Sequence, residues 1–225
     1  GRKLIMSVSG LFLVLFLLFH MSMNLAAVFS TEAYNAICEF LGANWYALAG
    51  TLILAAGVVV HLVYATVLTL HNRSSRGSQR YAMTAEPEGV TWASRNMYVL
   101  GIIIVLGLLL HLYNFWYNMQ FAEIIGNHEL GPFPPADGAA YIAALFSSPV
   151  YCIIYLVWFA AIWFHLTHGF WSAFHTIGWD NQTWLPRLKR IANVVATIVF
   201  LCFALVVIVF YLRSLGVCGG SCAGF

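Results

Sequence analysis

Five long runs of apolar residues alternate with polar connections along the chain. They cover about residues 4–29, 46–70, 97–121, 149–174 and 191–213. Crossing roughly 30 Å of hydrocarbon takes about 20 helical residues, whereas a strand of a membrane barrel needs only about 10. Each run therefore predicts one membrane-spanning helix, and we expect residues 1–225 to form a single all-α integral membrane domain, a bundle of five transmembrane helices.

The connections support these boundaries. The segment GNHELGPFPPADG at residues 126–138 contains three prolines, which prevent a helix from continuing between the third and fourth runs. Ser147-Ser148-Pro149 is typical of a helix start, because serine caps a helix and proline fits its first position. Residues 179–190 are expected to form a loop before the fifth helix.

Charged residues are scarce, and the two signs are placed on opposite sides of the runs. Only 8% of the residues are charged, against about 25% in soluble domains. Nine of the ten Lys and Arg residues flank the runs on one side: Arg2, Lys3, Arg73, Arg76, Arg80, Arg95, Arg187, Lys189 and Arg190. The acidic residues on the other side are Glu32, Glu39, Glu123, Glu129 and Asp137. The positive-inside rule makes the basic side cytoplasmic, so we expect a multi-pass protein of a bacterial inner (cytoplasmic) membrane, with the N-terminus inside and the C-terminus outside.

The five cysteines do not have the paired spacing of a zinc site. Cys218 and Cys222 lie in a glycine-rich tail on the expected outer side, where they could form a disulfide or remain two thiols. Cys38, Cys152 and Cys202 are expected to serve as small apolar residues.

Four histidines lie inside four different apolar runs, and helix geometry places them in two layers. At a rise of about 1.5 Å per residue, His20 lies roughly 24 Å and His111 roughly 21 Å from the cytoplasmic edge. His61 and His165 are on helices that run the other way and lie roughly 14 Å from that edge. His20 and His111 therefore form an outer pair, and His61 and His165 form an inner pair.

Paired imidazoles on opposed helices indicate metal ligands. Ionisable side chains inside a membrane are costly, and two haem groups with two axial histidines each fit the two layers. A zinc site would need three or four clustered ligands. Small residues one turn from a ligand would let a porphyrin lie against the helix, and they are Gly57 and Ala65 for His61, Gly107 for His111, and Ala161 and Gly169 for His165. His20 departs from this pattern, with Phe16 and Asn24 at those positions.

The remaining histidines have simpler interpretations. His168 is an alternative to His165 as the ligand, but it lies roughly 9 Å from the cytoplasmic edge and matches the inner layer less well. His71 and His175 fall at the inner interface, where they would contact haem propionates or only water. His128 lies in an outer loop and is expected to be solvated.

The order of these motifs resembles the cytochrome b membrane subunit of succinate:quinone oxidoreductases (succinate dehydrogenases and fumarate reductases) of the single-chain, five-helix, two-haem type. The resemblance covers nearly the whole chain and rests on SGLFLVLFLLFHMSMN, HLVY, HLYNFW and FHLTHGFWSAFHTIGW. In the last segment, a histidine followed by three residues and a glycine matches a haem-ligand motif of the family, with His165 in the first position. The resemblance implies two haem b groups, an outer one on His20 and His111 and an inner one on His61 and His165.

The resemblance also implies electron transfer, with no succinate chemistry in this chain. A flavoprotein subunit would handle succinate and an iron–sulfur subunit would carry the electrons. This chain would anchor both through its basic inner loops and pass electrons to a quinone, menaquinone in this type, near the outer haem. Glu39 and Glu123 are candidates for proton delivery to the quinone, against the simpler interpretation of solvated loop acids. Some two-haem fumarate reductases use a glutamate two residues before the ligand in the fourth helix for transmembrane proton movement; Trp163 stands there in this chain, so that path is not expected.

Two other functions remain open. The membrane cytochrome b of a hydrogenase or formate dehydrogenase would show a similar pairing in depth, although the helix count, the His-x3-Gly pattern and the ligand order favour the succinate type. A transporter or structural membrane protein with hydrogen-bonded or proton-carrying histidines would bind no haem.

Overall fold

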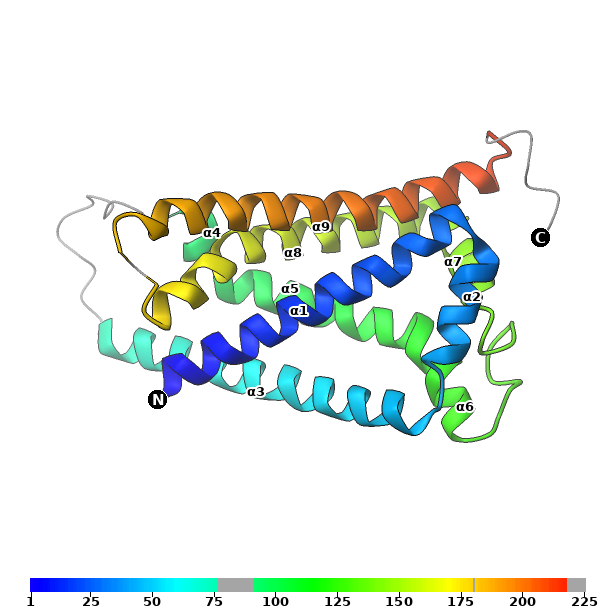
Figure 1. The fold of residues 1–225 in the computed structure, drawn as a ribbon, viewed down its shortest axis with the longest axis horizontal. Coiled ribbons are helices and arrows are strands. Elements are labelled where there is room, and N and C mark those ends of the chain that lie inside the picture. The colour runs from blue at the N-terminus through cyan, green and yellow to red at the C-terminus, as the bar shows by residue number, and fades with distance from the viewer. Residues whose placement is uncertain (77–90, 180, 218–225) are drawn as a thin grey trace.

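Five long helices run alongside one another in the computed structural model, which describes residues 1–76, 91–179 and 181–217. They are α1 (Arg2–Phe29), α3 (Trp45–Arg76), the continuous span Met97–Ile124, α8 (Pro149–Thr176) and α9 (Trp184–Ser214). All five are long and apolar enough to cross a membrane. The prediction of an all-α, five-helix membrane protein is confirmed, and the start of α1 and the end of α9 lie at opposite ends of the bundle (Figure 1).

Two predicted boundaries are wrong. The second span ends at Arg76 rather than at residue 70. The fifth span begins at Trp184 rather than at residue 191, so the basic segment placed in a loop forms the first turns of α9. Leu188 is buried there, and Pro186 lies in the first turn, where a missing backbone N–H costs little. The connection between α8 and α9 is correspondingly shorter than predicted.

The span Met97–Ile124 is not one regular helix. It consists of α5 (Met97–His111), a π-helical segment η1 (Leu112–Phe121) and α6 (Ala122–Ile124). The side-chain amide of Asn118, within this segment, donates to the carbonyl oxygens of Tyr113 and Asn114 at 3.0 and 3.1 Å. Long π-helical segments are rare and often occur at functional sites, and this one starts directly after His111.

Three short helices lie outside the spans: α2 (Thr31–Phe40), α4 (Trp92–Arg95) and α7 (Gly138–Phe146). The sequence patterns did not predict α2 or α7. Ser30 separates α2 from α1 because its backbone is extended, and its hydroxyl caps α2 by accepting from the Ala33 N–H at 3.1 Å. Asp137 caps α7 in the same way through the Ala140 N–H at 3.2 Å. α2 runs across one end of the bundle, next to α7 (Figure 1).

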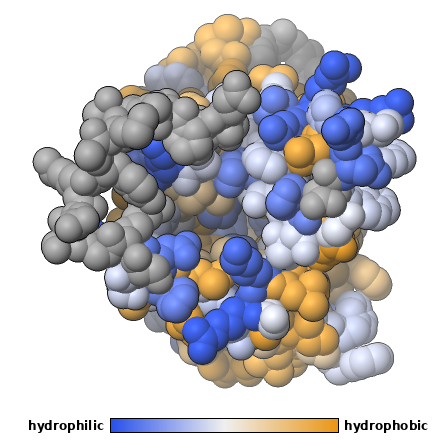
Figure 2. All heavy atoms as spheres, turned by 90° about the vertical axis from the view of Figure 1, so that its left-hand side faces the viewer, coloured by the Kyte–Doolittle hydropathy of each residue, from blue (hydrophilic) through white to orange (hydrophobic). Residues whose placement is uncertain are grey.

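The two ends of the bundle differ in charge. We call the end with Arg2, Lys3, Arg73, Arg95, Arg187, Lys189 and Arg190 the basic end, and the end with Glu32, Glu39, Glu123, Glu129 and Asp137 the acidic end. Figure 2 looks onto the basic end and shows hydrophilic residues over much of it, with hydrophobic residues at its edges. Arg80, Cys218 and Cys222 lie outside the described residues.

Arg213 is the one cation of the described chain that lies at the acidic end, and it has a structural role there. Its guanidinium donates to the carbonyl oxygen of Val28 at 2.8 Å. Val28 is in the last turn of α1, where carbonyl groups have no partner within the helix. Arg213 therefore ties the end of the last span to the end of the first.

The core lies along α8 and α9, which pack against each other more extensively than any other pair. Val199, Val207 and Phe210 of α9 are almost completely inaccessible. Apolar side chains on the outside of the bundle are more than half exposed, among them Leu15, Leu52, Leu106, Val157 and Leu201. An apolar exterior of this kind suits contact with lipid, where it costs no free energy.

The orientation in the membrane can be tested by labelling single cysteines in intact cells, in a variant without native cysteines. Because lysine and arginine are retained on the cytoplasmic side, Gln182→Cys at the basic end should be protected from a membrane-impermeant maleimide. Ala33→Cys at the acidic end should be labelled; both positions are exposed. The reverse pattern would invert the predicted topology, and permeabilised cells, in which both react, provide the control.

Candidate functional site

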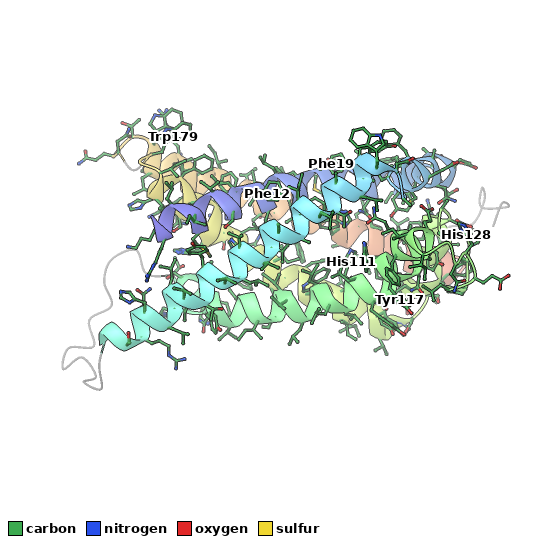
Figure 3. The ribbon with its side chains drawn as sticks, turned by 90° about the horizontal axis from the view of Figure 1, so that it is seen from below. Phe12, Phe19, His111, Tyr117, His128 and Trp179 are labelled. Carbon is green, nitrogen blue, oxygen red and sulfur yellow. The ribbon has the colours of Figure 1, made fainter. Side chains whose placement is uncertain are left out.

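The four histidines of the apolar spans meet as two pairs. The ring centres of His20 in α1 and His111 at the end of α5 are 5.7 Å apart, with the rings at 86° to each other. His61 in α3 and His165 in α8 are 6.4 Å apart, at 67°. Trp158 contacts His111 and lies seven residues before His165 in α8, so the pairs are separated by roughly 10 Å along the bundle. Figure 3 shows His111 well inside the bundle, between its two ends.

Aromatic rings surround the pair nearer the acidic end. Phe16 stacks on His20 at 5.4 Å, and Phe203 of α9 lies 6.0 Å from it. The rings around His111 are Phe115, Trp158 and Tyr155, at centroid distances of 5.2, 5.7 and 6.4 Å. Both imidazoles are therefore enclosed by apolar ring surfaces, which exclude water and lower the local dielectric constant.

The hydrogen bonds of the four rings differ. The amide nitrogen of Asn24 lies 3.3 Å from Nε2 of His20, and the phenol of Tyr34 in α2 donates to Oδ1 of the same Asn24 at 3.1 Å. Nδ1 of His61 lies 3.2 Å from the hydroxyl oxygen of Ser9. In contrast, the Nδ1 atoms of His111 and His165 are buried without a hydrogen-bond partner among the described residues.

These observations fit two metal centres with two axial imidazoles each. Metal–nitrogen distances of about 2 Å put the centres of two axial rings roughly 6 Å apart, close to the observed 5.7 and 6.4 Å. Buried polar atoms without partners are rare, so hydrogen bonding alone leaves His111 and His165 unexplained. Within the described residues no three or more His, Cys, Asp or Glu side chains form a metal-binding group, which leaves the pairs as candidate ligands.

The glycines beside the histidines have packing roles that the sequence interpretation did not include. The ring of Phe12 occupies the space next to Gly57, and the ring of Trp158 occupies the space next to Gly107. The Trp158 indole also donates to the carbonyl oxygen of Ile104 at 3.0 Å. These two glycines therefore admit aromatic side chains of neighbouring helices, whereas Gly169 lies against His165 itself.

The other histidines are placed nearer the ends. His168 packs edge-on against Trp171 at 5.0 Å, and the ammonium of Lys189 lies 4.8 Å from the centre of the same Trp171 ring. His71 and His175 are exposed near the basic end, and His128 is exposed in a loop at the acidic end (Figure 3). Of these, only His168 has a buried Nδ1 without a hydrogen-bond partner in the described chain.

The indole of Trp163 is directed to α9. Its nitrogen donates to the hydroxyl of Thr197 at 3.1 Å. The residue two positions before His165 therefore joins two helices by a neutral hydrogen bond, and it carries no titratable group.

Polar side chains inside the spans, which the sequence analysis did not single out, organise the acidic end. Oε1 of Gln120 accepts hydrogen bonds from Thr51 of α3 and from Trp116, both at 2.9 Å. Its amide nitrogen donates to the carbonyl oxygen of Gly42 at 3.0 Å. Asn114 similarly donates to the phenol of Tyr155 in α8 at 3.1 Å. Such residues could be found in a sequence as single amide or hydroxyl side chains within an apolar run, since these often bond to a neighbouring helix.

The two candidate carboxylates have different surroundings. Oε2 of Glu123 accepts from the backbone N–H of Ala43 at 2.7 Å, so this side chain braces the loop between α2 and α3. Glu39 is exposed on α2. Beside it, burial raises the pKa of Cys38 to about 11 and that of Tyr34 well above its usual value. Cys38 therefore stays a neutral thiol at physiological pH, in agreement with its predicted role as a small apolar residue.

A groove of about 280 Å³ lies between α1 and α2 at the acidic end. Its lining is apolar and consists of Phe19, Met23, Ala36, Ile37, Phe40 and Leu41. Phe19 precedes His20 in the chain, but successive side chains of a helix point about 100° apart, so the exposed Phe19 ring and the His20 ring face different directions. The groove is open rather than enclosed.

Comparison of the chain with protein families, with curated proteins and with solved structures finds no match. The arguments for a function therefore come from the residues and their geometry.

Gln120→Leu should destabilise the protein by about 1 kcal/mol, because hydrogen bonds between helices in membranes contribute about 0.6 kcal/mol each and two bonds to other elements are lost, to Thr51 of α3 and to Gly42 of the α2–α3 loop. The bond from Trp116 lies within the same span. Thermal unfolding of the purified protein in detergent, followed by circular dichroism, measures the change. Gln182→Leu at an exposed position is the matched control and should leave the unfolding temperature unchanged. Equal unfolding temperatures for the two variants would contradict the bracing role of Gln120.

Proposed function

We propose that this chain is a di-haem cytochrome b, with His20 and His111 as axial ligands of one haem and His61 and His165 as ligands of the other. The observation that carries the proposal is the meeting of four histidines from four spans as two pairs, 5.7 and 6.4 Å between ring centres. The alternative of purely hydrogen-bonded histidines has less support at His111 and His165, because their buried Nδ1 atoms have no hydrogen-bond partner in the described chain. His165 is preferred to His168 because its ring faces a histidine of another helix.

A haem bound to either pair would supply a reversible one-electron couple. The protein's part is to supply neutral imidazoles, to hold them on rigid helices and to keep water away. Phe16, Phe203, Phe115 and Trp158 do the last of these at the pair nearer the acidic end. Because the two pairs follow one another along the bundle, they form a route for electrons between its two ends.

We propose further that the chain is the membrane anchor of a succinate:quinone oxidoreductase. The resemblance in sequence suggests this. The Lys and Arg residues at the basic end support it by offering a docking face for a flavoprotein and an iron–sulfur subunit, and this face is largely hydrophilic (Figure 2). Electrons would enter at the inner pair of His61 and His165 and leave at the outer pair of His20 and His111. Succinate itself would be handled by the flavoprotein subunit.

The quinone, menaquinone in the type that the chain resembles, would bind near the acidic end. The groove between α1 and α2 supports this position, because its apolar lining suits an isoprenoid quinone. Glu39 is the better candidate for proton exchange, since it is exposed on α2, which lines the groove, whereas Glu123 is engaged with the loop. His71 and His175 at the basic end remain candidates for contact with the propionates of the inner haem.

The proposal predicts two b-type haems per chain, measured as the pyridine haemochrome of the purified protein. His165→Ala should lose one haem and His61→Ala the same one, since each removes an axial ligand of the inner site. His168→Ala is the matched control and should keep both. An unchanged circular dichroism spectrum shows that a variant is folded.

Three outcomes would contradict parts of this assignment. A wild-type protein without b-type absorption bands would overturn the haem proposal and favour a membrane protein with hydrogen-bonded histidines. Loss of a haem only in His168→Ala would make His168 the ligand. Copurification with a hydrogenase or formate dehydrogenase subunit, instead of a flavoprotein, would move the chain to another class of cytochrome b.

A further inference from the structure

Ser9 is a buried polar residue of α1 that contacts one of the proposed haem ligands. Its hydroxyl oxygen lies 3.2 Å from Nδ1 of His61 in α3. The same hydroxyl donates to the carbonyl oxygen of Met6 at 3.0 Å. The close approach of the two helices depends on the next residue, because a Cβ atom on Gly10 would lie 3.2 Å from Cε1 of His61.

The hydrogen atoms available at this contact determine which ring nitrogen of neutral His61 carries the proton. A serine hydroxyl has one hydrogen to donate and two lone pairs that accept. If His61 carries its proton on Nδ1, it donates to Ser9 while Ser9 donates to Met6, and both contacts are hydrogen bonds. If His61 carries its proton on Nε2, the single hydrogen of Ser9 serves only one of the two acceptors. In an apolar span the first arrangement is favoured, because both short contacts of Ser9 are then hydrogen bonds, whereas the second arrangement makes only one of them.

The selected form is also the one that can bind a metal. A neutral imidazole protonated on Nδ1 has a bare lone pair on Nε2, and donation of the Nδ1 proton to a neighbour orients the ring and makes it a stronger ligand. The other three proposed ligands differ. His111 and His165 have no hydrogen-bond partner at Nδ1 in the described chain, and the side-chain contact of His20 is made through Nε2.

We propose that Ser9 is a positioning residue of the inner haem, which holds His61 in the form protonated on Nδ1 and thereby lowers the reduction potential of the iron between His61 and His165. A stronger ligand favours ferric over ferrous iron, and hydrogen bonding to axial ligands is one of the means by which proteins set haem potentials. The inference rests on the proposed function, since it concerns a ligand of the proposed haem.

The test compares Ser9→Ala with Ser7→Ala in the purified full-length protein. Ser7 is a matched control: it is buried on the same helix, and its hydroxyl donates to the carbonyl oxygen of Lys3 at 3.0 Å without contact to a histidine. The readouts are the haem content per chain, the midpoint potential of each haem in a redox titration and the electron paramagnetic resonance spectrum of the ferric haems. Repeating both substitutions with His165→Ala, which retains only the outer haem, identifies which haem responds.

Ser9→Ala should raise the potential of one haem and change its resonance spectrum, because His61 becomes a weaker and less oriented ligand. A tenfold change in the ferric-to-ferrous ratio corresponds to about 59 mV for a one-electron couple, and a shift of up to that size is expected. Ser7→Ala should change neither haem. Ser9→Thr, which keeps the hydroxyl, should restore the potential, and Ser9→Ala should have no effect on the haem that remains in His165→Ala.

Each failure has its own meaning. Two haems with unchanged potentials and spectra in Ser9→Ala would overturn the role of Ser9 and leave the proposed function intact. Equal shifts in Ser7→Ala and Ser9→Ala would also overturn it, since they would reflect a general disturbance of α1. A wild-type protein without haem would overturn both proposals. If Ser9→Ala does not fold, Ser9→Cys, with a weaker acceptor, should give a smaller shift in the same direction, and its absence would count against the inference.

Discussion

Hydrocarbon offers no hydrogen-bond partner, so a polar side chain within a membrane span bonds either to a carbonyl of its own helix or to a group on another element. Ser7 and Ser22 follow the first course, and several other side chains follow the second. Asn114 bonds to Tyr155, Trp163 to Thr197, and Gln120 to Thr51 and Gly42. These hydrogen bonds join neighbouring elements, and apolar side chains pack between them. Against this background the histidines are unusual, because two of the four that meet in pairs keep a buried nitrogen atom without a partner.

Much of the fold could be predicted from hydrophobicity alone. Bilayer thickness fixes the length of a span, and the number and order of the five spans follow from it. The rise per residue also suffices to place His20 level with His111 and His61 level with His165, because depth depends only on counting along a helix. The structure brings these same residues within ring contact.

Features that depend on rotation about a helix axis, or on local backbone choices, could not be predicted in this way. The contact between Ser9 and His61 requires the two helices to turn these faces toward each other, and an apolar run does not encode that angle. The π-helical segment Leu112–Phe121 lies in an apolar run, and the run predicts a helix without distinguishing the π form from the α form. α2 and α7 are short, and each begins at a single capping residue, Ser30 or Asp137, in a connection where no apolar run was available to predict a helix. Gly57 and Gly107 were predicted to let a porphyrin lie against their helices, whereas the space beside them is occupied by the rings of Phe12 and Trp158.

The packing of α9 against α1 has a consequence for biogenesis. A membrane protein is inserted span by span in the order of its sequence, so the first and the last of these five spans are separated in time by the synthesis of the other three. Phe203 of α9 contacts His20, and Arg213 donates a hydrogen bond to the carbonyl oxygen of Val28 at the end of α1. The surroundings of His20 are therefore complete only after the last span has been inserted, whereas His61 and His165 are in place one helix earlier. If His20 and His111 hold the proposed haem, its stable binding would come late in assembly, after the fifth span has been inserted.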